Sequence, residues 1–213
     1  MAEVTFRQTL KRSKDSVGVR HQIFARQLGH LGLLFQQLGR YAEAGRLLEE
    51  AIAVIQTIPQ PHHTDLSAQR NNLALHYEQT GRYAEAERLL ASALATSETA
   101  LGPNHPCVAE QLNKVASNYR ITGRFEEGES LLLRALAIGE GSLGSEHPNV
   151  ATWRNNLALL YQCFGRYRDA EELLVRALET SKRVLGPEHP TVATQLNNLA
   201  LLYQEIGRYF AAE

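Results

Sequence analysis

The side chains best placed to form directional contacts are asparagines that recur at one spacing. They are Asn71, Asn113, Asn155 and Asn197, each 42 residues after the last, with Asn72, Asn156 and Asn198 directly after three of them. A carboxamide both donates and accepts hydrogen bonds. A row of amides could therefore pair with the backbone of an extended peptide whatever its side chains. Two alternatives stay open: the amides could bond between neighbouring helices, or they could recur because the repeats arose by duplication.

Two other patterns suggest chemistry but do not carry it. Histidines also recur once per repeat, at His63, His105, His147 and His189. They lie about one repeat apart, too far to share a metal ion ligated at about 2 Å, and we expect each to cap a helix. Residues 139–144 spell G-x-G-x-x-G, but no strand precedes them, so no nucleotide cofactor is expected. No P-loop, H-E-x-x-H or nucleophile elbow occurs either, which predicts no metal, no cofactor and no enzymatic activity.

A glycine-arginine-aromatic triplet defines the repeat that positions these residues. It begins at Gly39, Gly81, Gly123, Gly165 and Gly207, in steps of 42 residues. A fixed period of this size indicates stacked structural repeats, each contacting only its neighbours. The pattern predicts one array over residues 1–213. It comprises a leading helix (1–18), four full repeats (21–62, 63–104, 105–146 and 147–188) and a partial repeat (189–213).

Each repeat is written as two helices, which we call helix A and helix B. The last helix A carries Leu196, Leu199, Ala200 and Tyr203 at i, i+3, i+4 and i+7 and ends at Gly207. A helix B is predicted over 167–185, with small and large apolar residues alternating on one face. Small residues at fixed points let the two helices approach closely, and the aromatic fills the space beside them.

The two ends of the chain differ from the repeats. Residues 1–18 repeat the helix B pattern found four repeats later, and their basic side chains could form a polar cap. The chain stops barely into a helix B after Gly207. Terminal repeats normally carry a polar outer face, so we expect 189–213 to be cut from a longer array.

The composition excludes several classes of partner. The net charge is −1, which argues against a large nucleic-acid or anionic-membrane surface. No apolar run approaches the ~20 residues of a membrane span. The only cysteines, Cys107 and Cys163, are not in a C-x-x-C pair, which favours a reducing, cytoplasmic environment.

The repeat resembles the tetratricopeptide repeat (TPR). The resemblance rests on a small residue and an aromatic on helix A and paired alanines on helix B, and it covers nearly the whole chain. The 42-residue period and the Leu-Gly-x-x-His-Pro connection are similar to the TPRs of kinesin light chain. The resemblance implies an all-α, right-handed superhelical α-solenoid of stacked antiparallel helix pairs. Nothing resembles the heptad region that joins kinesin light chain to its heavy chain.

In such a superhelix the asparagine stripe of helix A would line a concave groove. The resemblance implies that the matching asparagines hold a bound peptide. The predicted groove residues are Asn71, Asn72, Leu75, Asn113, Lys114, Asn155, Asn156, Leu159, Asn197, Asn198 and Leu201. Repeat one departs from the pattern with Gly29 and His30, so we expect its end of the groove to be weaker or differently used.

Four residues are candidates for the rim of this groove. Arg70, Arg120 and Arg154 could meet an acidic peptide, or they could be solvated helix surface. Trp153 stands where the other repeats have glutamine. It is either a contact anchor, because tryptophan is enriched in binding hot spots, or a filler between helices.

These observations predict a scaffold that binds an extended segment of a protein partner in the groove. A regulatory array within a larger enzyme or signalling ATPase is the first alternative. Self-association through the open C-terminal repeat is the second. The sequence predicts neither a nucleic-acid nor a membrane partner.

Overall fold

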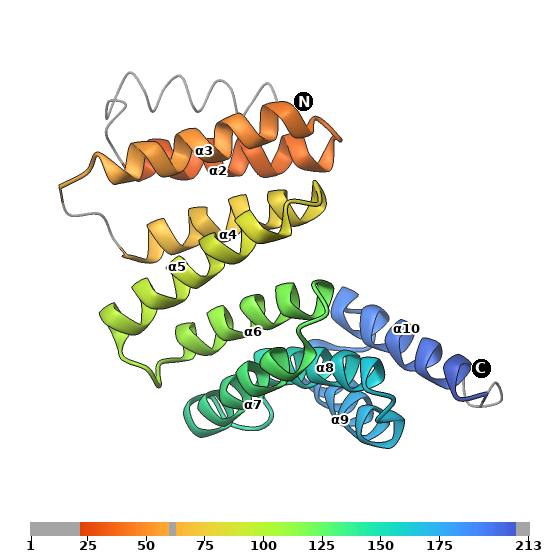
Figure 1. Ribbon diagram of the computed structural model, residues 1–213. Helices are drawn as coiled ribbons and strands as arrows, with labels where there is room; N and C mark the ends of the chain where they lie inside the picture. The colour runs from red at the N-terminus through yellow and green to blue at the C-terminus, as the bar shows by residue number, and fades with distance from the viewer. Residues whose placement is uncertain (1–21, 60–62, 208–213) are drawn as a thin grey trace. The chain divides into compact units, whose positions relative to one another are not determined.

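The computed structural model describes residues 22–59 and 63–207, and every regular element in these ranges is an α-helix (Figure 1). The A helices are α2 (Gln22–Gln37), α4 (His63–Gln79), α6 (Pro106–Ile121), α8 (Pro148–Cys163) and α10 (Pro190–Glu205). The B helices are α3 (Tyr41–Gln56), α5 (Tyr83–Leu101), α7 (Phe125–Ser142) and α9 (Tyr167–Leu185). The predicted all-α repeat fold is thereby confirmed. The leading helix predicted over 1–18 lies outside the described residues.

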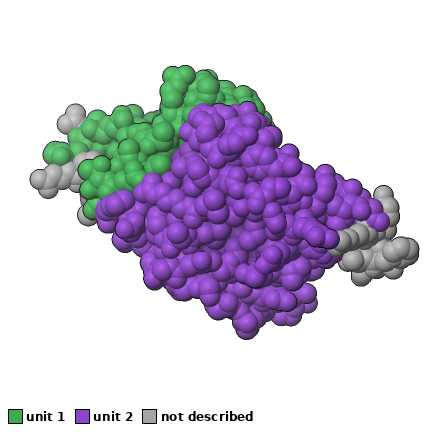
Figure 2. Space-filling model, turned by 60° about the horizontal axis from the view of Figure 1, so that its bottom comes forward, with its two compact units in different colours: residues 1–100 green, residues 101–213 purple. Residues whose placement is uncertain are grey.

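The chain forms two compact units, residues 1–100 and 101–213, coloured separately in Figure 2. In unit 1, α2 packs on α3, and α3 packs on α4. In unit 2, each helix from α6 to α9 packs on the helix that follows it, up to α10. The A helices also meet each other, α2 with α4 in unit 1 and α6 with α8 with α10 in unit 2. Side chains at one repeat position of helix A are therefore neighbours in space.

Histidine and proline start three of the A helices. Nδ1 of His105, His147 and His189 accepts a hydrogen bond from the backbone N–H two residues later, and a proline follows each histidine at the first helical position. Proline loses nothing there, because that N–H has no partner inside the helix. The predicted capping role is confirmed for these three histidines. His63 is itself the first residue of α4.

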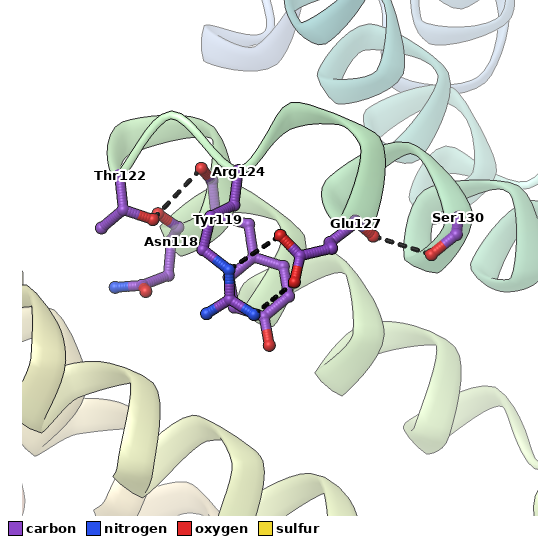
Figure 3. Close-up of polar contacts among 6 residues, drawn as sticks. All are labelled: Asn118, Tyr119, Thr122, Arg124, Glu127 and Ser130. Atoms are coloured by element: carbon purple, nitrogen blue, oxygen red, sulfur yellow. Dashed lines mark hydrogen bonds and ion pairs between the residues drawn. The ribbon is translucent and has the colours of Figure 1, made fainter.

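The glycine-arginine-aromatic triplet turns the chain from helix A to helix B. Its glycine has φ between 70° and 79° at all five positions, a left-handed conformation that ends helix A. The arginine then folds back over the aromatic ring near the end of helix A, with its Cζ 3.8–4.0 Å from the ring centroid in the four full repeats. It also pairs with an acidic residue three positions later. Figure 3 shows this for Arg124, which stacks on Tyr119 and pairs with Glu127 at 2.6 Å.

Small residues let the helices of a pair approach each other. Ala44, Ala86 and Ala170 occupy one position of helix B and have no exposed surface. Gly128 takes that position in α7, where an added Cβ would lie 2.8 Å from Cδ1 of Leu160. Because a Cβ essentially never comes that close to another atom, glycine leaves space for the leucine of the next helix A.

A candidate partner-binding surface on the A helices

In unit 2 the asparagines form a hydrogen-bonded chain across three A helices. Asn198 on α10 donates through Nδ2 to Oδ1 of Asn155 on α8 at 3.0 Å. Asn155 donates to Asn156 at 3.3 Å. Asn156 in turn donates to Oδ1 of Asn113 on α6 at 2.8 Å. We call these four residues the amide ladder. Each bond between helices joins the second asparagine of one repeat to the first asparagine of the repeat before it.

The amide ladder joins neighbouring A helices, which is one of the alternatives given above for these asparagines. Each neutral hydrogen bond contributes about 1 kcal/mol net, so the ladder ties α6, α8 and α10 together. It does not exhaust the side chains, because an amide has two N–H donors and two lone pairs and the bonds above use only part of them. Asn155 is 6% exposed and the least accessible member. The other three members are half-buried.

The remaining predicted residues of unit 2 lie beside the ladder. Asn197 on α10 is exposed, and Leu201, one turn later, is 49% exposed. Leu159 on α8 is half-buried. Lys114 on α6 stands where the later repeats have their second asparagine, and it pairs with Glu110 at 2.5 Å. Asn197 and Leu201 are thus the predicted contacts most open to a partner.

In unit 1 the same positions on α4 are arranged differently. Asn72 donates to Oε1 of Gln69 at 3.5 Å, within its own helix. Oδ1 of Asn71 is buried with no hydrogen-bond partner among the described residues. A Cβ on Gly29 would lie 2.0 Å from Oε1 of Gln69. Gln69 therefore fills the space where repeat one would carry its asparagine, which explains the departure at Gly29. Leu75 is 44% exposed.

Two of the three predicted rim arginines hold the fold together instead. Arg70 donates to the carbonyl of Ser92 and to Oγ1 of Thr96 on α5, and burial lowers the pKa of its guanidinium. Arg154 is 9% exposed. It donates to the carbonyl of Ser145 at 2.9 Å and pairs with Glu140 at 2.6 Å. Neither side chain lies free at a rim.

The other two rim candidates, Arg120 and Trp153, differ from each other in exposure. Arg120 on α6 is half-buried and forms no ion pair within residues 22–59 and 63–207. Trp153 on α8 is 2% exposed. A Cβ on Gly139 of α7 would lie 2.2 Å from Cζ3 of its indole ring. Trp153 is therefore the filler between helices and not an exposed anchor.

The described residues also limit the kinds of site present. No group of three or more His, Cys, Asp or Glu side chains within them could hold a metal ion. Among the same residues, no helix combines the length and apolar character of a membrane span.

A family model described as tetratricopeptide repeat matches four overlapping segments: 24–99, 65–119, 109–182 and 165–213. Together these segments extend over most of the chain. The chain belongs to the tetratricopeptide repeat family. TPR repeats generally mediate protein–protein interaction and are typically non-catalytic.

Solved structures narrow the type of TPR. The chain is 30% identical to a putative kinesin light chain with nearly identical TPR-like repeats from Podosopora anserina, over 90% of this chain and 91% of that one, with a TM-score of 0.71. BtubC (BKLC) from P. vanneervenii is 24% identical over 99% of this chain and 84% of that one, with a TM-score of 0.80. The apo form of RapI is 15% identical over 88% and 66%, with a TM-score of 0.70, and shows the fold alone. No curated protein matched.

Sequence reasoning missed a clamp between consecutive TPRs. The hydroxyl of Tyr203, at the end of one helix A, donates to Glu171 of the preceding helix B at 3.1 Å. Arg166 pairs with Glu129 in the same way, at 2.9 Å. The Gly-Arg-aromatic triplet marks the period and its glycine predicts the end of helix A, but the sequence reasoning assigns no role to the arginine. The available signal was the acidic residue at the fifth position of helix B in repeats two to four: Glu87, Glu129 and Glu171.

Proposed function

We propose that this chain is a scaffold whose A helices bind an extended segment of a protein partner. The observation that carries the proposal is the surface beside the amide ladder in unit 2. Asn197 and Leu201 are exposed there, and Leu159 is half-buried on the neighbouring A helix. This surface offers both amide and apolar contacts on consecutive repeats. The general role of TPR repeats in protein interaction supports the proposal.

The chemistry suits an extended backbone. Such a backbone presents an N–H and a C=O at every residue, and these groups need partners when they lose water. The exposed amide of Asn197 can supply both a donor and an acceptor. Half-buried amides of the ladder keep unused capacity on their second N–H and lone pairs. Leu159 and Leu201 would cover an apolar side chain of the bound segment.

The charge of the surface bears on the bound segment. Lys114 is already paired with Glu110, which leaves this part of α6 close to neutral. Arg120 lies two turns after Asn113 on the same helix and is half-buried. An acidic residue of the partner would fit beside Arg120. Such a charge at an edge would favour rate and specificity more than affinity.

We keep two alternative functions as proposals. A regulatory array that holds a neighbouring domain would use the same surface for an intramolecular partner. Self-association through the last repeat is favoured by α10, on which Leu196 and Leu201 are 43% and 49% exposed.

We also propose a cytoplasmic location, in keeping with the two unpaired cysteines.

Panning a random peptide library against the chain tests the proposal. The parent is compared with an Asn197→Ala/Leu201→Ser variant, which changes two exposed side chains and no bond of the amide ladder. An Asn104→Ala variant, in the exposed connection between α5 and α6, is the matched control. We expect the parent and the control to select one shared motif and the double variant to lose it. Equal selection by all three proteins, with each still helical by circular dichroism, would refute this site.

A further inference from the structure

One buried position of helix A holds a histidine in repeat two. His76 on α4 is 5% exposed, and the same position carries Leu34, Leu160 and Leu202 in other repeats. Its Nδ1 is buried and has no hydrogen-bond partner among the described residues. A buried polar atom without a partner is destabilising, so an aliphatic residue would serve packing better. The imidazole adds a property that leucine lacks, since it can take up a proton near physiological pH.

The residue of α3 that faces His76 also differs from its equivalents in the other repeats. A Cβ on Gly45 of α3 would lie 2.8 Å from Nε2 of His76, so the imidazole occupies the space that a side chain would take. The other repeats carry Glu87, Glu129 and Glu171 at the position of Gly45. Repeat one therefore lacks the carboxylate that the other repeats carry at this position of helix B. The hydroxyl of Tyr77 donates to Glu49 instead, one turn further along α3.

The surroundings of the ring oppose a positive charge. The side chain of His76 is buried, with the rings of Tyr41 on α3 and Tyr77 on α4 at 6.4 and 6.0 Å, centroid to centroid, so little water can solvate an imidazolium there. Burial lowers the pKa of His76, the positive charge of Arg82 lowers it further, and Glu49 acts in the opposite direction. Within the described residues, no ionisable side chain of α2 or α5 acts on the ring. The neutral imidazole is therefore the form that fits between α3 and α4.

We propose that His76 is an acid-sensitive joint, and that its protonation loosens the packing of α3 against α4 in unit 1. The sign follows from linkage. Because the pKa in the folded chain is lower than in the unfolded chain, the unfolded state binds more protons as the pH falls. The stability that depends on neutral His76 is present above the ordinary value of about 6.5 and is lost as the pH falls below it.

Thermal unfolding of the full chain at pH 7.5 and pH 5.5 tests whether protonation of His76 lowers stability. The parent is compared with His76→Leu, which copies three other repeats, and His76→Asn, which copies Asn118. All other residues of the chain are identical in the three proteins, so the comparison isolates position 76. We expect the parent to lose about 2–4 °C more than either variant between the two pH values. An equal loss in all three proteins would overturn the proposal.

A second measurement does not depend on the variants. In a proton NMR titration of the parent, the ring of His76 should titrate at lower pH than an ordinary histidine, whose pKa is about 6.5. Hydrogen exchange at pH 5.5 should increase in α3 and α4 more than in α8 and α9. A ring of His76 that titrates at or above the ordinary value of about 6.5 would also overturn the proposal.

Discussion

At the scale of single residues, several large side chains on helix A each face a glycine on a neighbouring helix. Trp153 faces Gly139, and Gln69 faces Gly29. In the first pair both members depart from the repeat: Trp153 replaces a glutamine, and Gly139 stands where Ile55, Ser97 and Ser181 stand elsewhere. The departure of one residue is therefore explained by the other, and neither is explained alone.

The Trp153–Gly139 contact predicts a non-additive pair of substitutions. Gly139→Ala should lower the free energy of unfolding by about 1–3 kcal/mol, because the new methyl group overlaps the indole ring. Adding Trp153→Gln, the residue of the other repeats, should recover most of that loss. Denaturant unfolding of the two single variants and the double variant measures the coupling.

Gly141 supplies the control in the same helix. It is exposed, and a Cβ there meets nothing within 4 Å. Gly141→Ala should raise stability by up to about 1 kcal/mol through helix propensity alone. If the effects of Gly139→Ala and Trp153→Gln simply add, the two residues do not compete for one space.

At the scale of elements, the start of helix A depends on a histidine cap. The Nδ1 of His147 accepts from the N–H of Asn149 at 3.1 Å. His147→Ala should destabilise the chain by about 0.5–2 kcal/mol, whereas His147→Ser should retain most of the stability because serine also caps well. Chemical denaturation at pH 7.5 measures both. Equal losses in the alanine and serine variants would show that the cap bond contributes nothing.

The amide ladder predicts how adjacent repeats are joined in unit 2. Asn156→Ala removes the bond to Asn113 and the acceptor of Asn155, so it should lower the free energy of unfolding by about 1–2 kcal/mol. Asn104→Ala, at an exposed amide outside the ladder, should change it by less than about 0.5 kcal/mol. Urea unfolding of both variants compares them. A matching small change in both would mean that the ladder does not stabilise the stack.

Local elements were predictable from the sequence, and cross-helix contacts were not. The His-Pro pairs and the Gly-Arg turns gave the ends of α6, α8 and α10 because proline and left-handed glycine act within a few residues. The partner of Asn198 depends on rotamers and on the offset between α8 and α10, which no spacing reveals. Arg70 and Arg154 were predicted at a rim. A helical position does not show that a long side chain folds back onto a neighbouring helix.

At the scale of the whole molecule, TPR membership sets the class of function and leaves the partner open. Residues 1–213 as one continuous array remain a prediction, as do the partner-binding surface and self-association. In a solenoid, stability is approximately a sum of repeat and neighbour terms. Changes in unit 2 such as Asn156→Ala should therefore leave α2 and α3 largely unaffected. Residue-resolved hydrogen exchange can follow this.

The affinity of a selected peptide for three forms of the chain is the measurement that bears most closely on the proposed partner-binding surface. Isothermal titration would compare the parent, Asn197→Ala and the matched Asn104→Ala. We expect Asn197→Ala to bind at least about tenfold more weakly, equivalent to about 1.4 kcal/mol, and Asn104→Ala to bind like the parent. Unchanged affinity in folded Asn197→Ala would contradict the proposed surface and place the partner elsewhere on the chain.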